Sequence, residues 1–501
     1  MKVNKMGQYV GIDLGTTFSA VAHIDATGRP QIINNERDVN ITPSVVAKNK
    51  GELIIGEFAR KTWGNDNRRG AARFKRDMGT SVKYKIEDLE YSPTQLSAEV
   101  LKHLKKVTED KIGTIQEAVI TIPANFAHEA RDATMEAAIA AGLNVKYIIN
   151  EPTAAALYYA YQSNGELSGT YVVFDLGGGT FDVSIIKVVG QNVEVLASNG
   201  LHKLGGADFD LALWEIIAKK YLVQTKNSLT MNEFSVNDAE DAKRTLSDRK
   251  KVTVEIEREF VDISRIDFEE SISSMLAQIE MLCETTIDEA EIELSDITSV
   301  FFAGGSTRIP VIYEIAKKVF RKDPISTVNV DEVVALGAAL YAAHRSDGSN
   351  LSEIQKKSIN QLKVAERTSC YFGTLSVGYS ESKGDVLMNS ILIEKGALIP
   401  CSVTESFHTR VAGQTSVNCR ITESRAPETN PKFVKIIHEE ELELPEGREA
   451  GQEIKITYSY DVNQIMHATF KDVASGREKV ISLSFVNSGN DSAAINKFLV
   501  D

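Results

Sequence analysis

The sequence predicts an α/β protein of two duplicated lobes, followed by an all-β sandwich domain. The lobes are predicted because an apolar run, an aspartate, a Gly/Thr-rich turn and a second apolar run occur around Asp13 and again around Asp175. Residues 7–345 also alternate strand-like runs with amphipathic or Ala-rich helices, as α/β domains do. The sandwich is predicted because the pattern changes, from Thr368 to about Phe485, to short segments with apolar residues at alternate positions.

Composition is typical of a globular protein with more than one domain. The 501 residues suffice for two or more domains at about 100–200 residues each. The net charge of −14 disfavours a nucleic-acid surface, which needs a basic field. The N-terminus has no apolar signal core, and no stretch reaches about 18 apolar residues, so we expect no membrane segment. Four widely spaced cysteines without a metal-binding pair favour a reducing, cytoplasmic location.

The repeated pattern indicates a phosphate site. Its apolar runs are predicted to be buried strands, and the turns between them tight hairpins. Glycines allow close backbone approach and turn N–H groups bind anions, whereas a carboxylate there requires a cation, usually Mg²⁺ held through water. An ordinary hairpin explains one copy, but two copies with matching aspartates favour a clamp around a metal–nucleotide phosphate tail. The candidate residues are Asp13, Gly15, Thr16, Thr17, Asp175, Gly177, Gly178, Gly179 and Thr180.

The elements between the two copies follow from periodicity and from the residues that begin and end helices. Ala118–Ile122 is predicted to be a strand. An Ala-rich helix from about residue 127 to residue 141 should end at Gly142, a suitable residue after a helix. Val145–Ile149 is the next predicted strand, and the following helix should contain Pro152 in its first turn.

Two further segments are candidates for nucleotide contacts. Ser299–Phe302 is a predicted strand that leads through the Gly-Gly loop 303–310 into an amphipathic helix, whose N-terminus suits a phosphate or ribose; a plain strand-to-helix turn is the alternative. In the segment 240–247, four polar residues at i, i+3, i+4 and i+7 share one helix face. Such a face can bind ribose and stack on adenine, although a solvated helix face explains the residues equally well. These residues are Glu240, Lys243, Arg244 and Ser247.

Together, the two Asp-Leu-Gly loops, the loop 303–310 and the segment 240–247 resemble the heat-shock protein 70 chaperones of the DnaK type, within the actin-like ATPase superfamily. The segments 150–156, 204–210 and 329–332 also match. The resemblance covers residues 8–345 densely and 366–487 more loosely. It implies an actin-like nucleotide-binding ATPase domain at 1–345, a linker at 346–365, a β-sandwich substrate-binding domain at 366–487 and a tail at 488–501.

The resemblance also implies a role for each matching residue. Lys75 would position the attacking water and steady the charge on the γ-phosphate. Asp13 and Asp175 would hold the water shell of Mg²⁺, and Glu151 and Asp182 would complete the polar site around water and metal. Thr16, Thr17, Gly178, Gly179 and Thr180 would contact the phosphates. The remaining nucleotide-binding residues would be Gly15, Gly177, Gly205, Gly206, Glu240, Lys243, Arg244, Ser247, Gly304, Gly305, Ser306, Arg308 and Asp331.

The chain departs from the family's pattern in several places. The family's run of leucines flanked by aspartates is absent from residues 351–375, so we expect weak coupling between ATP state and client affinity. Ala207 stands where the family has Glu, and the chain ends soon after the β-domain, so we expect no helical lid. In the β-domain, the resemblance places Tyr379, Phe407 and Val417 at a peptide cleft that Arg410 would narrow or polarise. Phe407 and Val417 would serve equally well as sandwich core.

The expected function is therefore that of an ATP-dependent chaperone of the stress response, which hydrolyses ATP slowly and binds unfolded, apolar, extended polypeptide. The expected cofactors are ATP or ADP with Mg²⁺, and K⁺ is a further candidate ion. The expected partners are client polypeptides, a J-domain co-chaperone and a nucleotide-exchange factor, with no nucleic acid and no membrane. One alternative is an ATP-binding regulatory or binding module without a folding cycle. A small-molecule kinase or a filament former is a third class, which the β-domain disfavours.

Overall fold

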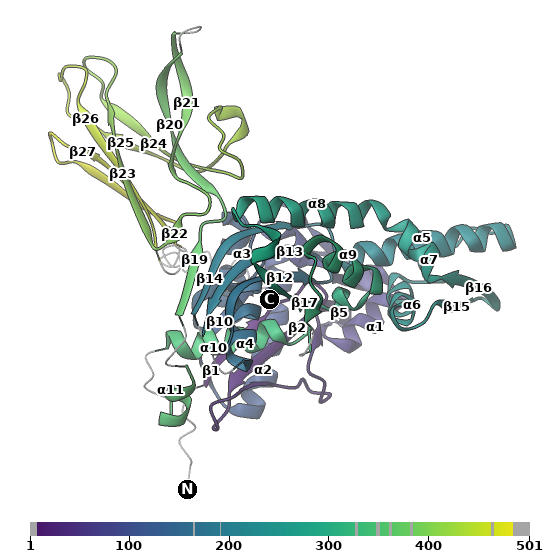
Figure 1. The fold of residues 1–501 in the computed structure, drawn as a ribbon. Coiled ribbons are helices and arrows are strands. Elements are labelled where there is room, and N and C mark those ends of the chain that lie inside the picture. Colours follow the sequence, from purple (N-terminus) through teal and green to yellow (C-terminus); the bar gives the residue numbers. More distant parts are fainter. Residues whose placement is uncertain are drawn as a thin grey trace. The chain divides into compact units, whose positions relative to one another are not determined.

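The computed structural model divides the chain into two compact units, Met1–Val364 and Ala365–Asp501. The first unit is α/β and the second is all-β, which agrees with the predicted fold class (Figure 1). The residues that the structure describes are 8–163, 166–190, 192–325, 329–346, 351–359, 363–380, 384–461 and 465–483.

The first unit contains two sheets that share one topology. The strand order is β11-β10-β1-β2-β3 in the first sheet, where β4 also pairs with β2, and β18-β17-β12-β13-β14 in the second. In each sheet the first strand of an antiparallel hairpin, β1 or β12, also pairs with a parallel strand, β10 or β17. The predicted duplication is therefore confirmed. The bounds are β1 Gln8–Asp13, β2 Phe18–Ile24, β3 Pro30–Ile32, β4 Thr42–Pro43, β10 Ile115–Ile122, β11 Val145–Asn150, β12 Ser168–Leu176, β13 Phe181–Val189, β14 Asn192–Leu201, β17 Ile297–Ala303 and β18 Pro324–Ile325.

Two helices join the sheets through one buried cluster, and they pack against each other very closely. The rings of Tyr159, Phe301 and Tyr171 stack in this cluster with centroids 4.2 and 4.8 Å apart. Small residues set the helix spacing, because a Cβ added at Gly337 would lie 1.7 Å from the carbonyl oxygen of Ala154. The lobes therefore meet at a packed contact with no spare room. The two helices are α4 (Glu151–Gln162) and α10 (Val333–Arg345).

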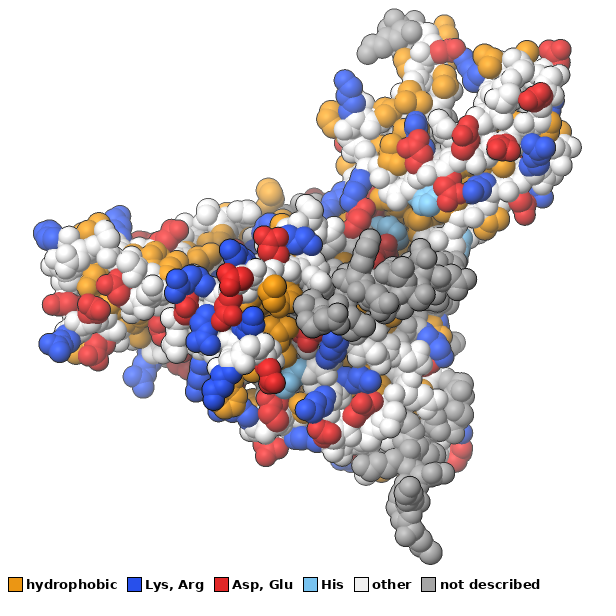
Figure 2. All heavy atoms as spheres, turned by 180° about the vertical axis from the view of Figure 1, so that it is seen from behind, with side chains coloured by type: hydrophobic (Ala, Val, Ile, Leu, Met, Phe, Trp, Pro, Cys, Tyr) orange, Lys and Arg blue, Asp and Glu red, His pale blue; other side chains and the backbone are white. Residues whose placement is uncertain are grey.

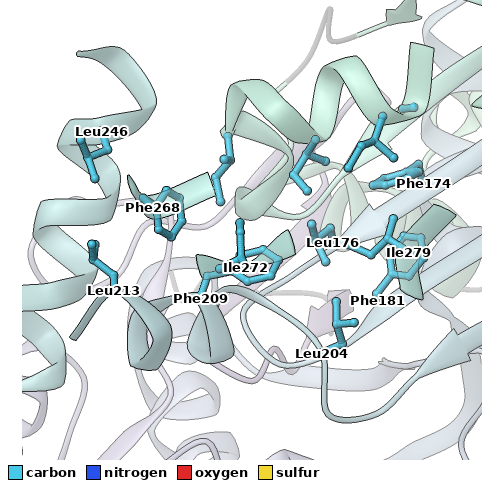
Figure 3. Close-up of a cluster of buried hydrophobic side chains, with 14 of the residues drawn as sticks. Phe174, Leu176, Phe181, Leu204, Phe209, Leu213, Leu246, Phe268, Ile272 and Ile279 are labelled. Atoms are coloured by element: carbon cyan, nitrogen blue, oxygen red, sulfur yellow. The ribbon is translucent and has the colours of Figure 1, made fainter. Parts of the chain in front are cut away.

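The second lobe has a further hydrophobic core, part of which Figure 3 shows. Phe174 and Phe181 of the β12–β13 hairpin lie in it, as do Phe209 and Leu213 of α5 and Leu246 of α6. This core fixes α5 and α6 relative to the hairpin, so that both helices are held beside the second Gly-rich loop. The helices of this lobe are α5 (Gly206–Thr225), α6 (Val236–Asp248), α7 (Arg265–Ser271), α8 (Ser273–Glu289) and α9 (Pro310–Phe320), and its strands β15 (Lys251–Ile256) and β16 (Glu259–Ser264) form a separate hairpin.

The helices of the first unit that were predicted from their terminal residues are present. The Ala-rich segment forms α3 (His128–Ala140), after which Gly142 adopts a φ of 71°, and Pro152 lies in the first turn of α4. The first lobe also carries a small sheet, β6-β5-β7, against which α1 packs. Its remaining elements are β5 (Val45–Asn49), β6 (Glu52–Ile55), β7 (Gly70–Ala72), β8 (Tyr84–Ile86), β9 (Leu89–Tyr91), α1 (Glu57–Asn65), α2 (Pro93–Ile112) and the 3₁₀ turns η1 (Asn67–Arg69) and η2 (Phe74–Asp77).

The charged connector after α10 folds onto the first unit. It forms a short helix, α11 (Glu353–Ile359), and the side chains of Leu351 and Ile359 are buried in the same cluster as α4 and α10. The amide nitrogen Nε2 of Gln355 donates hydrogen bonds of 3.0 Å to the carbonyl oxygens of Ile24 and Asp25. Residues 351–359 are therefore part of the first compact unit.

The second unit is a sandwich of two four-stranded sheets, β21-β20-β24-β25 and β23-β26-β27-β28. Tyr458 is fully buried between them, and its hydroxyl donates to the carbonyl oxygens of Gly373 and Arg420. The predicted sandwich is confirmed. The bounds are β19 Lys363–Arg367, β20 Tyr371–Ser380, β21 Gly384–Ile393, β22 Leu398–Ile399, β23 Cys401–His408, β24 Ser416–Ser424, β25 Lys435–Glu443, β26 Glu453–Tyr460, β27 Met466–Asp472 and β28 Glu478–Leu483.

The surface is charged and mixed in sign. On the face that Figure 2 shows, basic and acidic side chains are interspersed. Among the helices of the described residues, none has the length and apolar content to cross a membrane.

Candidate functional site

A cavity of about 370 Å³ in the first unit is lined by both Gly/Thr-rich loops. The strand order explains this placement. Because β1 is parallel to β10 and β12 is parallel to β17, each sheet brings the carboxyl ends of several strands to one edge, where the loops follow. The other walls come from the segment 304–309, from α6 and from residues 330–334.

The two loops face each other across a narrow gap. A Cβ added at Gly178 would lie 1.8 Å from Oγ1 of Thr17, and one added at Gly179 would lie 2.4 Å from the side chain of Thr16. Real Cβ contacts are essentially never shorter than 3.0 Å, so side chains at these positions would force the loops apart. The absence of a side chain at Gly178 and Gly179 therefore allows the two copies to form opposite walls of one channel.

Hydrogen bonds from neighbouring elements hold each loop in shape. In the first loop, the hydroxyl of Ser44 donates to the carbonyl oxygen of Gly15 at 2.8 Å, and the backbone N–H of Ser44 donates to Thr17 at 2.8 Å. In the second loop, the carbonyl oxygen of Gly177 accepts from the N–H of Gly206 at 3.0 Å and from the hydroxyl of Ser306 at 2.9 Å. The backbone N–H groups that could bind an anion are thus fixed in advance.

Buried carboxylates lie at the inner end of the cavity. Burial, together with the charge of Glu151, raises the pKa of Asp13 to about 7 and raises the pKa of Asp175 well above its ordinary value. Burial and Glu151 raise the pKa of Asp182 in the same way, although the charge of Lys75 opposes the rise. Burial and neighbouring carboxylates thus destabilise the ionised form of each group, and a bound cation would offset both effects.

Lys75 is the cation within this cluster. It belongs to η2, its side chain is 5 % exposed, and its Nζ lies 2.5 Å from Oε1 of Glu151. The ring of Phe126 lies 5.9 Å away, so an apolar wall covers one side of the ammonium group. Lys75 and Glu151 both line the cavity, and Glu151 therefore fixes the ammonium group of Lys75 in its wall.

The outer part of the cavity is formed largely by α6. The predicted face is observed, because Glu240, Lys243, Arg244 and Ser247 all line the cavity. Burial alone would raise the pKa of Glu240, but Arg244, Lys243 and Arg60 hold it below its ordinary value. The guanidinium of Arg244 lies 5.2 Å from the centre of the Phe18 ring. A flat, charged and hydrogen-bonding surface of this kind suits a nucleoside.

The loop 303–310 lines the cavity, and it contains a turn that was not predicted. A 3₁₀ turn, η4 (Gly305–Arg308), separates β17 from α9. Gly304, Gly305 and Ser306 line the cavity, and so does Ile309, the N-cap residue of α9. Gly304 lies against β12, where a Cβ would be 2.4 Å from the carbonyl oxygen of Leu176.

Comparison with known proteins identifies the family. A family model described as "Hsp70 protein" matches residues 9–501. The chain belongs to the Hsp70 family. It is 32 % identical to the proteins named "Chaperone protein DnaK" from Thermosipho melanesiensis, over 516 residues, and from Thermosipho africanus, over 519 residues. Each alignment covers 99 % of this chain and 83 % of the relative. Hsp70 proteins generally bind ATP or ADP with Mg²⁺ and work with client polypeptides and co-chaperones.

Most residues that the sequence indicated for the Hsp70 nucleotide site come together in the cavity, and two do not line it. Asp182 lies behind the cavity wall, opposite Asp175 in the β12–β13 pairing. Gly205 supports the wall from outside, because a Cβ there would lie 2.7 Å from the backbone nitrogen of Gly179. The predicted residues that do line the cavity are Asp13, Gly15, Thr16, Thr17, Lys75, Glu151, Asp175, Gly177, Gly178, Gly179, Thr180, Gly206, Glu240, Lys243, Arg244, Ser247, Gly304, Gly305, Ser306, Arg308 and Asp331.

Sequence reasoning missed several residues of the Hsp70 site. Phe18 directly follows the first loop, and Asp210 ends the matching segment 204–210, so both had a signal in the motifs themselves. Arg60 had no such signal: it does not line the cavity, and only the fold brings it to Glu240 and Asp241 of α6. Other cavity residues that were not predicted are Ile41, Ala207, Asp248, Ile309, Val330 and Val334.

The candidate peptide residues of the second Hsp70 unit differ in exposure. The side chain of Tyr379 is 77 % exposed on β20. Phe407 and Val417 are half-buried and pack against the sandwich core, in keeping with the alternative reading of these two residues. Arg410 forms an ion pair with Asp385, the residue opposite Tyr379 in the β20–β21 hairpin.

Proposed function

We propose that this Hsp70-family chain hydrolyses ATP and uses that reaction to bind and release unfolded, apolar polypeptide segments. The observation that carries the proposal is the meeting, in one cavity, of two facing Gly/Thr loops and a buried carboxylate cluster around Lys75. The loops supply backbone N–H groups for a phosphate tail, and the carboxylates require a cation. A Mg²⁺–nucleotide satisfies both requirements at once.

The residues present fit Mg²⁺ and a nucleotide. Asp13 and Asp175 would hold Mg²⁺ through water, and their raised pKa values support a site that gains from a positive ion. The same surplus of charge makes K⁺ a further candidate. Thr16, Thr17 and Thr180 would hold the phosphates together with the N–H groups of the loops. When bound, Mg²⁺ neutralises charge on the phosphate oxygens during transfer.

The protein groups have separate tasks in hydrolysis. Glu151 anchors Lys75, which would orient the attacking water and stabilise charge on the γ-phosphate. Asp182 is buried behind the cavity wall close to Thr180, and it would complete the polar site around water and metal. At the outer end, Glu240, Lys243 and Ser247 would hold the ribose. Arg244 and Arg308 would contact the adenine. Little covalent chemistry is required of these groups, since positioning and charge supply most of the catalysis of phosphoryl transfer.

For the second unit we propose that the β20–β21 hairpin contacts the client. Val377 and Leu387 lie opposite each other in the hairpin and are 44 % and 50 % exposed, and Tyr379 follows on the same face. Contiguous exposed apolar side chains of this kind mark binding sites. The ion pair of Arg410 with Asp385 borders this face and would limit the width of an apolar segment.

A second candidate function is an ATP-binding regulatory module without a folding cycle. One observation favours it. Where the family has a leucine-rich linker, this chain has α11, which is packed on the first unit through Leu351, Gln355 and Ile359. A connector held in this way would couple the nucleotide bound to the first unit only weakly to the client affinity of the second unit.

The test is the rate of ATP hydrolysis with and without an apolar, extended peptide and a J-domain protein. We expect slow turnover, at the lower end of ordinary enzyme rates or below it, that the peptide and the J-domain protein increase. Tight ATP binding with a rate that neither addition changes would favour the regulatory module. No binding of ATP or ADP in the presence of Mg²⁺ would contradict both functions.

One ion pair joins the two lobes through α1 and α6. Nη2 of Arg60, on α1 of the first lobe, lies 3.0 Å from Oε2 of Glu240 and 3.3 Å from Oδ1 of Asp241, both on α6 of the second lobe. Arg60 and Glu240 are mostly buried, at 15 % and 8 % side-chain exposure, so the pair is only weakly screened by solvent. Opening the lobes to release a nucleotide must break it.

We therefore expect Arg60→Ala to release ADP about tenfold faster. Hydrogen bonds to charged groups contribute about 1.5–3 kcal/mol, and such differences appear mainly in the off-rate. Stopped-flow release of a fluorescent ADP analogue measures the change. Arg68→Ala is the matched control, because the side chain of Arg68 is 84 % exposed and forms an ion pair with nearby Asp66. Equal release rates for the wild type and Arg60→Ala would show that the ion pair does not hold the lobes closed.

A further inference from the structure

The short segment that carries Lys75 is fastened to the other lobe on both sides of that residue. Nη2 of Arg76 donates to both carboxylate oxygens of Asp208, at 3.0 and 2.9 Å. Nη2 of Arg73 donates to Oδ2 of Asp210 at 3.2 Å. Both aspartates lie in the first turns of α5, in the second lobe, whereas η2 belongs to the first lobe. Two ion pairs therefore join the lobes on either side of Lys75 in the sequence.

The backbone of this segment does not hold its shape by local preference alone. Arg73 has a φ of 63° and a ψ of 14°, the left-handed region that non-glycine residues rarely adopt. Its guanidinium is kept in place by Asp210 and by the ring of Trp63, whose centre is 5.9 Å away. A strained conformation persists only where the surroundings fix it. Here those surroundings include a side chain of the opposite lobe.

Asp208 connects the segment to the second phosphate loop. The carboxylate oxygen Oδ2 that binds Arg76 also accepts the backbone N–H of Gly205 at 2.9 Å, which caps α5. The next N–H groups of α5, those of Gly206 and Ala207, donate to the carbonyl oxygens of the second loop. One carboxylate thus fixes the segment of Lys75 and the start of the helix that supports the loop.

Asp210 makes the corresponding connection to the nucleoside wall. Its Oδ1 lies 2.7 Å from Nζ of Lys243 on α6, and Lys243 also donates to the carbonyl oxygen of Gly206 at 3.0 Å. Asp210 and Lys243 both line the cavity, and the side chain of Asp210 is 4 % exposed. The first turns of α5 therefore join the lysine segment, the second loop and α6.

We propose that Arg73 and Arg76 are positioning residues for hydrolysis: by binding Asp210 and Asp208 of the other lobe, they set the distance between Lys75 and the second phosphate loop. The proposal rests on the proposed ATP hydrolysis. Neither arginine lines the cavity, and both act through Lys75. Because the ion pairs form only when the lobes approach each other, Lys75 reaches its working position when the nucleotide cleft closes.

The experiment compares Arg76→Gln and Asp208→Asn, singly and together, in otherwise wild-type protein and in Lys75→Ala. Asn at position 208 keeps an oxygen for the N–H of Gly205, so this variant weakens the ion pair and preserves the helix cap. The readouts are the single-turnover hydrolysis rate, the Kd for ATP and the melting temperature. Arg68→Gln is the control for the loss of an exposed arginine in the same region.

We expect each single variant to hydrolyse bound ATP about tenfold more slowly, with a Kd for ATP within about threefold of wild type, because small misplacements of a catalytic group cost rate rather than affinity. The double variant should be no slower than the worse single one, since both remove one interaction. In the Lys75→Ala protein, neither substitution should lower the rate further.

Three outcomes overturn the proposal. Unchanged rates in the single variants, with a hydrolysing wild type, would overturn the positioning role alone. A tenfold loss that persists in the Lys75→Ala protein would show that Arg76 acts on something other than Lys75. A wild type that binds but does not hydrolyse ATP would overturn the proposed hydrolysis, and the positioning role with it.

Discussion

Lys75→Ala should lower the single-turnover rate of ATP hydrolysis by roughly 100-fold or more while leaving the affinity for ATP largely unchanged. The charge of Lys75 is required chiefly where negative charge develops in the transition state, so its loss affects the chemical step more than binding. Its position supports this role. Nζ is held by Glu151, the side chain is 5 % exposed, and both residues line the cavity together with the two loops.

The same substitution has a predictable side effect on stability. Removing one partner of a buried ion pair costs about 3–5 kcal/mol when the other charge stays buried and unpaired. The melting temperature is therefore measured together with the rate, so that a loss of folded protein is not mistaken for a loss of catalysis.

Lys102→Ala is the matched control, because the side chain of Lys102 is 41 % exposed and forms an ion pair with Glu99 on its own helix. Its hydrolysis rate should equal that of the wild type. Normal single-turnover hydrolysis in Lys75→Ala would contradict the assigned site, since no other cation among the described residues that line the cavity lies beside Glu151.

The parts of this fold that could be predicted from sequence are those that depend on short local patterns of residues. The duplicated loop was visible because each copy needs an aspartate and glycines at fixed positions after a buried strand. The α6 face was visible because its four polar residues follow the helical period. The two loops were expected to face each other, and they do so closely, since a Cβ added at Gly178 would lie 1.8 Å from Oγ1 of Thr17.

The parts that could not be predicted depend on contacts between segments far apart in the chain. Arg60, Arg73 and Arg76 are three of many arginines in a stretch with mixed charges, and only the closed lobes bring them to acidic partners on α5 and α6. The turn η4 was also missed, because the loop must pass close to β12 at Gly304 before α9 begins. The periodicity of apolar residues gives no information about a short 3₁₀ turn of this kind.

Helices α4 and α10 make a very close backbone contact at Gly337. Helix propensity and packing predict opposite effects of Gly337→Ala on stability, and the close contact determines which effect is larger. Alanine stabilises an exposed helix interior by about 1 kcal/mol relative to glycine. At position 337, however, the new Cβ would lie 1.7 Å from the carbonyl oxygen of Ala154 and 2.4 Å from its carbonyl carbon. Both are backbone atoms of α4, which cannot turn aside as a side chain can.

We therefore expect Gly337→Ala to destabilise the first unit by about 3 kcal/mol or more, since overpacking costs 1–3 kcal/mol even where neighbours can adjust. The helices cannot relax away from each other freely, because Gly11 of β1 holds α10 from another side, where a Cβ would lie 2.1 Å from the backbone nitrogen of Ala339. Differential scanning calorimetry of the whole chain measures the transition of this unit. Gly64→Ala is the control: it makes the same change inside α1, where the new Cβ meets the amide of Asn237. This movable group donates to the carbonyl oxygen of Arg60 at 3.1 Å, so any loss of stability should be limited to that one hydrogen bond. If Gly337→Ala melts as high as Gly64→Ala, then α4 and α10 can separate without loss, and the rigid contact between the lobes that this spacing implies does not exist.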